Sequence, residues 1–102
     1  MAKFAKAEIC PMTSYFGGII CQEVVKYTGK FTPLQQWYHF DIFNALPLEK
    51  VNTKPMDSRY DDMIAVFGRE LQEKLKEQKT FMVGAGALGC ELIKSFALMG
   101  LG

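Results

Sequence analysis

The sequence predicts a helix-rich α/β chain with a few strands, and three observations lead to that class. Apolar residues recur every three or four positions over residues 11–27, which is the period of a helix. Residues 30–41 are rich in aromatic side chains, as strands are. A short apolar run at residues 81–83 leads into a glycine turn and another helix, an order typical of α/β folds.

The first predicted block consists of the helix over residues 11–27 and the strand over residues 30–41. Pro11 suits a first helical turn, where a missing N–H has no cost, and Gly29 suits the position just past the end. Gly17 and Gly18 lie inside this helix and are unfavourable there, so we expect another backbone to approach them closely. Pro33 should lie at the start or on the edge of the strand, because it has no N–H to donate.

A second block follows after a joint at residues 47–56, which lacks periodicity and contains two prolines. Ser58 and Asp61 resemble a helix N-cap, and Gly68 is expected to end that helix after an apolar face. A charged helix over residues 70–79 should bury Leu71 and Leu75 and turn Gln72 to water. The last helix, residues 89–98, is apolar nearly all round and is expected to be buried on most sides.

The glycine turn between the predicted last strand and last helix is the strongest functional signal. Gly84, Gly86 and Gly89 have the spacing GxGxxG, in which the glycines permit a tight turn, a close approach of phosphate and close packing of the helix. The start of the helix offers unpaired N–H groups to an anion. The sequence therefore predicts an incomplete Rossmann-like, nucleotide-binding fold, and the alternative is a junction that uses glycine only for packing. The acid that holds a ribose is expected about 20 residues further on, beyond Gly102.

Composition excludes several other classes. The 102 residues are 49% hydrophobic and 23% charged, which is ordinary for a small globular domain. The net charge of +1 gives no reason to expect nucleic acid or a membrane surface as a partner. The apolar runs are shorter than a bilayer span, and the N-terminus lacks the apolar region of a secretory signal.

The cysteines and the histidine predict neither a metal site nor a catalytic pair. Cys10, Cys21 and Cys90 have no metal-ligand spacing, and free thiols suggest a reducing compartment. Cys90 follows the glycine turn, where a helix dipole lowers a thiol's pKa, but a small buried packing residue is the favoured interpretation. His39 has no Ser or Cys partner nearby in the sequence and is interpreted as a polar strand residue, and Trp37 as part of a core strand.

Taken together in this order, six blocks of sequence resemble the eukaryotic ubiquitin-activating enzyme family. The blocks are residues 16–19, 22–26, 29–33, 36–37 with 40–41, 58–61 with 64–68, and 83–91. The resemblance implies a ThiF-type adenylation fold in two related halves, of which the second binds ATP and Mg²⁺ and adenylates the C-terminus of ubiquitin. A separate cysteine domain then carries ubiquitin as a thioester, and a further domain recruits the ubiquitin-conjugating enzyme. A place in the cytoplasm and nucleus is implied in the same way.

By this resemblance, residues 1–46 correspond to the closing helix and strand of the first, inactive half, residues 47–56 to a linker, and residues 57–102 to the opening of the second half. Gly84, Gly86, Ala87 and Gly89 match the turn beneath the ATP phosphates, with Ala87 contributing mainly backbone. The family's contributing helix carries an Arg that reaches the partner half's nucleotide. Asp62 stands at that position here, so we expect no such contact from this helix.

The expected function is therefore part of a ubiquitin-activating enzyme, with no catalytic residue and no metal ligand assigned in this chain. We expect the chain by itself to be inactive, and its uncovered apolar surface to favour self-association. Two alternatives stay open at this point: a dinucleotide-binding oxidoreductase module, and a non-catalytic interaction fragment whose glycine turn is purely structural.

Overall fold

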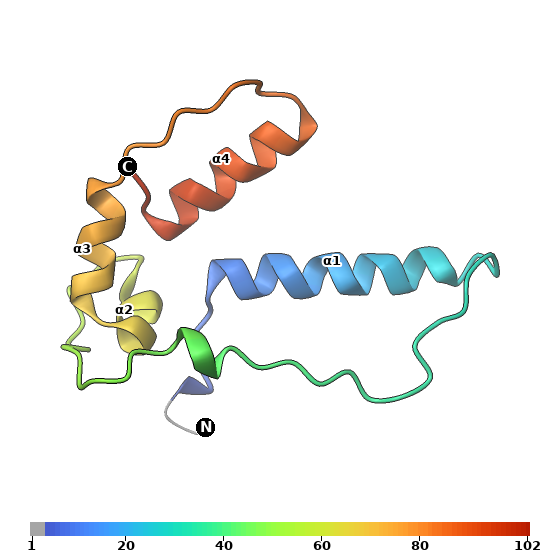
Figure 1. The fold of residues 1–102 in the computed structure, drawn as a ribbon, viewed down its shortest axis with the longest axis horizontal. Helices are drawn as coiled ribbons and strands as arrows, with labels where there is room; N and C mark the ends of the chain where they lie inside the picture. Colours follow the sequence, from blue (N-terminus) through green and yellow to red (C-terminus); the bar gives the residue numbers. More distant parts are fainter. Residues whose placement is uncertain (1–3) are drawn as a thin grey trace.

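The computed structural model describes residues 4–102, and within them the chain is helical without any strand. The expected strands at 30–41 and 81–83 are therefore wrong as hydrogen-bonded elements: both segments are extended, but neither has a partner strand (Figure 1). The elements are α1 (Cys10–Lys26), the short 3₁₀ helix η2 (Phe43–Ala45), α2 (Asp61–Phe67), α3 (Arg69–Glu77) and α4 (Ala87–Met99). In this part of the chain no helix has the length and apolar character needed to cross a membrane.

Helix α1 confirms the first predicted element almost to the residue. It begins at Cys10 with Pro11 in its first turn, and it ends at Lys26. Gly29 follows in a left-handed conformation with φ of +83°. The expected close approach to Gly17 and Gly18 is wrong within the described structure, because a Cβ placed on either glycine would meet nothing within 4 Å.

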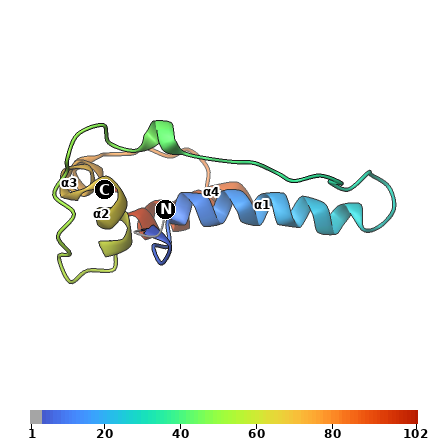
Figure 2. The ribbon, with the colours of Figure 1, turned by 90° about the horizontal axis from the view of Figure 1, so that it is seen from below.

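The extended segment 30–41 runs back alongside α1, as both views of the ribbon show (Figures 1 and 2). Aromatic contacts hold it there: the ring of Phe40 lies 4.6 Å from that of Tyr15 and 5.5 Å from that of Phe16. The hydroxyls of Tyr15 and Tyr38 are 2.6 Å apart, and this hydrogen bond raises the pKa of Tyr38. Trp37 remains 87% exposed, so the interpretation of Trp37 as a core strand residue is wrong for this structure.

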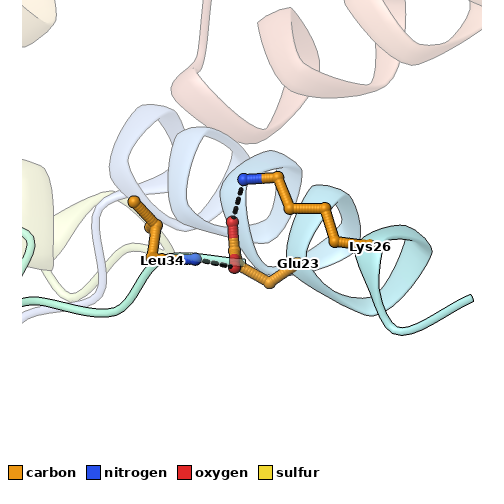
Figure 3. Close-up of polar contacts among 3 residues, drawn as sticks. All are labelled: Glu23, Lys26 and Leu34. Carbon is orange, nitrogen blue, oxygen red and sulfur yellow. Dashed lines mark hydrogen bonds and ion pairs between the residues drawn. The ribbon is translucent and has the colours of Figure 1, made fainter. Parts of the chain in front are cut away.

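Glu23 provides the polar link between α1 and the same segment (Figure 3). Its carboxylate accepts hydrogen bonds from Lys26 Nζ at 2.6 Å and from the Leu34 N–H at 2.9 Å. The lysine contact, followed by the Leu34 bond, lowers the pKa of Glu23. The segment is thus fixed by the Glu23–Leu34 hydrogen bond, the tyrosine pair and a small aromatic cluster in place of a strand ladder.

The joint between the two predicted blocks is an irregular segment held by Arg69. Its Nε donates to the Lys54 carbonyl at 2.8 Å and its Nη2 to the Pro55 carbonyl at 2.7 Å. The Arg69 N–H also donates to the Asn52 carbonyl at 2.9 Å. These bonds satisfy backbone groups that a segment without regular structure cannot pair internally, and they fix the joint against the start of α3.

Helix α2 supplies the buried core of the described residues. Ile64 is 0% exposed, and Met63 and Val66 are buried beside it, which confirms the predicted apolar face. Ser58 Oγ donates to the Asp61 carboxylate at 3.2 Å, but the N-cap residue of α2 is Tyr60 and no side chain caps the helix, so the expected N-cap at Ser58 is wrong. The Met56 N–H, followed by the Ser58 backbone and hydroxyl, lowers the pKa of Asp61. Gly68, with φ of +89°, ends α2 as expected.

Helix α3 packs against α2 with a different face from the predicted one. Leu71 is 37% exposed, whereas Gln72 is only 2% exposed and was expected to face water. Two leucines four residues apart do not determine which side of a short helix meets its neighbour. The expected burial of Leu71 and exposure of Gln72 are both corrected by the structure.

Helix α4 is more exposed than its apolar composition predicts. It packs against α1, with Cys10 Sγ 3.9 Å from the Ser95 carbonyl, but none of its residues is fully buried. Leu88 is 82% exposed, and Leu92, Ile93 and Leu98 are each at least 42% exposed. The expectation of burial on most sides is wrong here, because extended chain without strands leaves the helix no sheet to cover it.

Candidate functional site

The glycine turn that precedes α4 has the local geometry that its sequence predicts. Gly84 adopts φ of +95°, a conformation that side-chain-bearing residues rarely take. A Cβ on Gly89 would lie 2.4 Å from the Gly84 carbonyl oxygen, which real contacts do not permit. The first glycine therefore makes the turn, and the third lets α4 fold back against it.

Gly86 is the N-cap residue of α4 and has a different environment from the other two glycines. Its φ of −75° is open to any residue, and a Cβ at this position would meet nothing within 4 Å. The absence of a side chain is therefore required neither by the backbone nor by a neighbouring atom of the described chain. A site where backbone must come close to a ligand gives a physical reason for glycine here.

Backbone donors of the turn face solvent without protein partners. Among residues 4–102, no hydrogen bond is formed by the N–H groups of Gly84, Gly86 or Ala87, and all three residues are exposed. The first bond after the turn runs from the Cys90 N–H to the Gly86 carbonyl at 2.9 Å. Unpaired donors at a helix start, together with the positive end of the helix dipole, suit an anion.

Cys90 lies in the first turn of α4 and is exposed, so its expected role as a buried packing residue is wrong here. Its Sγ lies 3.3 Å from the Ala85 carbonyl, to which it donates. No base stands beside it among the described hydrogen-bond partners, so the geometry offers no nucleophile–base pair.

The extended segment before the turn arches over the flank of α4. Thr80 and Met82 face Ile93 and Phe96 across a largely apolar pocket of about 250 Å³. Figure 1 shows this arch leading from α3 to the far end of α4. Residues 81–83 lead directly into the turn, as predicted. Because they have no partner strand, the side chains of Phe81 and Val83 remain 92% and 87% exposed.

Other predicted residues take no part in this site. His39 is exposed on the segment beside α1, Cys21 is exposed on α1, and Cys10 is partly buried near α4. Within residues 4–102, no three His, Cys, Asp or Glu side chains gather as metal ligands. The glycine turn and these side chains are therefore separate features of the molecule.

A second cleft of about 350 Å³, between the start of α1, α2 and the end of α4, has the wrong charge for a polyphosphate. It is lined by the carboxylates of Glu8 and Asp62 against the guanidinium of Arg59. Asp62, which stands where the family places a nucleotide-reaching Arg, accepts the Glu8 N–H at 3.0 Å. In this chain Asp62 thus ties the residues before α1 to α2.

Comparison with known proteins places the glycine turn in a family. The ThiF family matches residues 59–102, a range that includes α2, α3, the turn and α4. The chain is 54% identical over 104 residues to "Ubiquitin-activating enzyme E1 1" of Triticum aestivum, which covers 98% of the chain. It is 48% identical over 108 residues to "Ubiquitin-like modifier-activating enzyme 1" of Homo sapiens, which covers all of it. The chain belongs to the ubiquitin-activating enzyme family.

The match extends over a small part of each relative. The chain spans 10% of the length of the wheat and human proteins and 9% of an Arabidopsis thaliana relative that is 52% identical over 101 residues. The match to the ThiF family over residues 59–102 supports a Rossmann-like adenylation fold, which is incomplete in this chain because the described residues contain no strand. The resemblance stated from the sequence is thereby confirmed at the level of the family.

Sequence reasoning missed two residues that organise the surroundings of the site. The sequence gives no prediction for Arg69, yet its side chain donates to the Lys54 and Pro55 carbonyls and its backbone N–H to the Asn52 carbonyl. Gln72 was placed in water, yet its amide is buried against the end of α4. Polar residues on a charged helix give no signal of burial until the packing of its neighbours is known.

Proposed function

We propose that this chain forms part of an enzyme that uses ATP to adenylate the C-terminus of ubiquitin and passes it to a cysteine as a thioester. In this proposal the turn formed by Gly84, Gly86, Ala87 and Gly89 lies beneath the ATP phosphates. Residues 1–46 would close the first adenylation half, residues 47–56 would link the halves, and residues 57–102 would open the second. The ThiF match begins at residue 59, close to that last boundary, which supports it.

The open position at Gly86 is the single observation that carries the proposal. A turn used only for packing needs glycine at Gly84, for its φ, and at Gly89, for its contact with Gly84. It has no need of glycine at Gly86, where a side chain would project into empty space. Phosphate oxygens that approach the exposed N–H groups would need that space.

The chemistry proposed for the site matches what such a turn supplies. When a carboxylate attacks the α-phosphate of ATP, the reaction needs alignment and neutralisation of phosphate charge more than covalent help from the protein. The N–H groups of the turn would hold the phosphates in a fixed place at the start of α4. Among residues 4–102 no three His, Cys, Asp or Glu side chains gather as metal ligands, and no step of the proposal passes through Mg²⁺.

Ubiquitin and a ubiquitin-conjugating enzyme are the proposed partners of the whole protein, and the cytoplasm and nucleus its proposed location. The family membership supports the two proposed partners, because ubiquitin activation precedes the transfer of ubiquitin to a conjugating enzyme. Nucleic acid and membrane are not proposed, since a net charge of +1 provides no electrostatic attraction to either.

The exposed surface supports the proposal that the chain belongs to a larger fold. Its accessible area is 8576 Å². A compact monomer of the same mass would expose about 5,800 Å². The radius of gyration is 16.6 Å, against about 13 Å for a compact domain of this length. We expect further segments of the natural enzyme to cover this excess, and the isolated chain to self-associate through it, which light scattering over a range of concentrations would detect.

The decisive experiment changes Gly86 in the whole natural enzyme and measures ATP–pyrophosphate exchange in the presence of ubiquitin. Gly86→Val should leave the protein folded, because its φ and surroundings accept a side chain. We expect exchange to fall at least tenfold through a higher KM for ATP. Unchanged exchange by a folded Gly86→Val enzyme would reject the placement of phosphates on this turn.

A nucleotide titration separates the remaining alternatives. Calorimetry on the whole enzyme should show a preference for ATP, whereas an oxidoreductase module would prefer NAD, and a purely structural turn would bind neither. The 102-residue chain by itself should show no pyrophosphate exchange, because it lacks most of the expected ATP contacts. Robust exchange by this chain would contradict the proposal that the remaining contacts come from elsewhere in the enzyme.

A further inference from the structure

We propose that Gln72 is a positioning residue that holds the C-terminal end of α4 and so sets the direction in which α4 presents the glycine turn. Gln72 is the most buried polar side chain of the described residues, at 2% exposure, and it lies on α3. Its Nε2 donates to the Met99 carbonyl at 2.9 Å, across 27 residues of sequence. The bond joins the middle of one helix to the last turn of another.

The Met99 carbonyl is a group that α4 cannot satisfy by itself. At the end of the helix, the Gly100 N–H donates to the Ala97 carbonyl and the Leu101 N–H to the Phe96 carbonyl, which is how many helices end at a left-handed glycine. Those two bonds leave Met99 without a donor from its own helix. A carbonyl only accepts, so the amide nitrogen of Gln72 must be the group that faces it.

Close packing at Gly100 reinforces this contact. Gly100 has φ of +76°, and a Cβ there would lie 2.6 Å from Gln72 Nε2 and 2.9 Å from the Tyr60 ring. The Gly102 N–H adds a second bond to α3, donating to the Leu75 carbonyl at 3.2 Å. The end of α4 is therefore enclosed between α3 and Tyr60 with no room for a side chain.

The turn end of α4 is not enclosed in this way, although α1 packs along the helix. Leu88 beside the turn is 82% exposed, and Figure 1 shows α4 meeting α3 with its C-terminal end while its turn end points away. With 13 residues, the helix is about 20 Å long. A tilt of about 5° at the held end would thus move the turn by nearly 2 Å over that length. A displacement of about 1 Å is enough to impair catalysis strongly.

The second atom of the Gln72 amide makes no such bond. Its Oε1 is buried and has no hydrogen-bond partner in the described part of the chain. A buried polar atom without a partner lowers the stability of the fold. A Met of similar size would avoid that cost but would leave the Met99 carbonyl without its donor, so what the amide adds over Met is the directional bond to the end of α4.

The first test measures orientation without any ligand. Backbone N–H residual dipolar couplings of the 102-residue chain report the angle between α3 and α4. In the unchanged chain, one alignment tensor should fit the couplings of both helices. In Gln72→Met we expect the couplings of α4 to deviate from the tensor that fits α3. Gln78→Met, a matched change on the exposed end of α3, should leave that fit intact. An identical α3–α4 angle in Gln72→Met and the unchanged chain would overturn the proposal.

The second test rests on the proposed function and uses the whole natural enzyme. Gln72→Met should raise the KM for ATP in pyrophosphate exchange about tenfold, with the KM for ubiquitin unchanged, while Gln78→Met alters neither. A loss of active enzyme, with both KM values unchanged, would mean that Gln72 only stabilises the fold. If Gly86→Val leaves exchange intact, the proposed function fails by itself, and the couplings still decide whether Gln72 orients α4.

Discussion

The two ends of this molecule use similar apolar residues in opposite ways. Around α2 and α3, short helices meet one another and the end of α4, and they bury Met63, Ile64 and Val66. Along α1, a longer helix with an equally clear apolar period leaves Ile20 62% exposed and Val24 66% exposed. An apolar stripe is therefore buried only where the chain folds a second surface onto it.

The way in which the two ends are held together differs as well. Neighbouring backbones and a buried amide hold the α2–α3 region, with Gly100 enclosed by Gln72 and Tyr60. Exposed side-chain contacts hold the segment beside α1, through Glu23 and the tyrosine pair. We therefore expect local unfolding to begin in the α1 region and to reach the α2–α3 region last.

The largest effect should come from removing the centre of the buried cluster. Ile64→Ala deletes a side chain that is 0% exposed, and such changes cost about 2–5 kcal/mol in free energy of unfolding. Ile20→Ala, at 62% exposure, should change stability by less than about 0.5 kcal/mol. Chemical denaturation of both variants measures the difference; equal effects would show that the two ends are not distinct in packing.

Two glycines with similar positive φ give the next largest contrast. Gly29→Ala and Gly100→Ala both force a side chain into positive φ, at +83° and +76°, which costs about 1–2 kcal/mol. At Gly29 the Cβ meets nothing, whereas at Gly100 it collides with Gln72 and Tyr60. We expect Gly100→Ala to lower the thermal unfolding temperature clearly more than Gly29→Ala does. Equal decreases in the two variants would contradict the close packing at the end of α4.

A smaller effect of opposite sign is expected within α1. Gly17→Ala should stabilise the helix by about 1 kcal/mol, because alanine is the better helix former and no atom lies within 4 Å of the new Cβ. Slower amide exchange in α1 would confirm it. If another copy of the chain packs on this glycine pair, the same change will instead weaken self-association, which light scattering would detect.

The smallest expected effect concerns the exposed link at Glu23. Because its pKa is lowered in the folded chain by Lys26 and Leu34, its contribution is present above the ordinary glutamate pKa and is lost as the pH falls through the lowered value. Glu23→Gln should speed exchange of the Leu34 amide at neutral pH and remove this pH dependence. An unchanged Leu34 exchange rate in Glu23→Gln would show that the aromatic contacts alone hold the segment.

Much of the helical structure and the turn could be predicted from local patterns. Pro11 and the period of apolar residues identify α1, Gly68 ends α2, and the glycine spacing identifies the turn and the start of α4. Each of these signals acts within a few residues of its own position. The strands at 30–41 and 81–83 were wrong because a strand exists only with a partner, and composition cannot supply one.

The candidate site, too, could be predicted from the sequence only in part. Gly84 and Gly89 were assigned roles that the structure confirms, a positive φ and a backbone contact of 2.4 Å. The phosphate-binding role of the turn stays a prediction, with the open position at Gly86 in its favour. Gln72 was placed on the wrong side of its helix, since two leucines define too weak a stripe to orient nine residues.

By itself, the sequence determined where helices begin and end, which glycines bend the backbone, and which family the chain belongs to, because these depend on short-range geometry and residue identity. Only the tertiary structure decided that Gln72 of α3 is buried against the end of α4, whereas Leu71 is 37% exposed. It also decided that α1 and α4 keep much of their apolar surface exposed. Burial is a property of two surfaces in contact, and a sequence pattern describes one surface at a time.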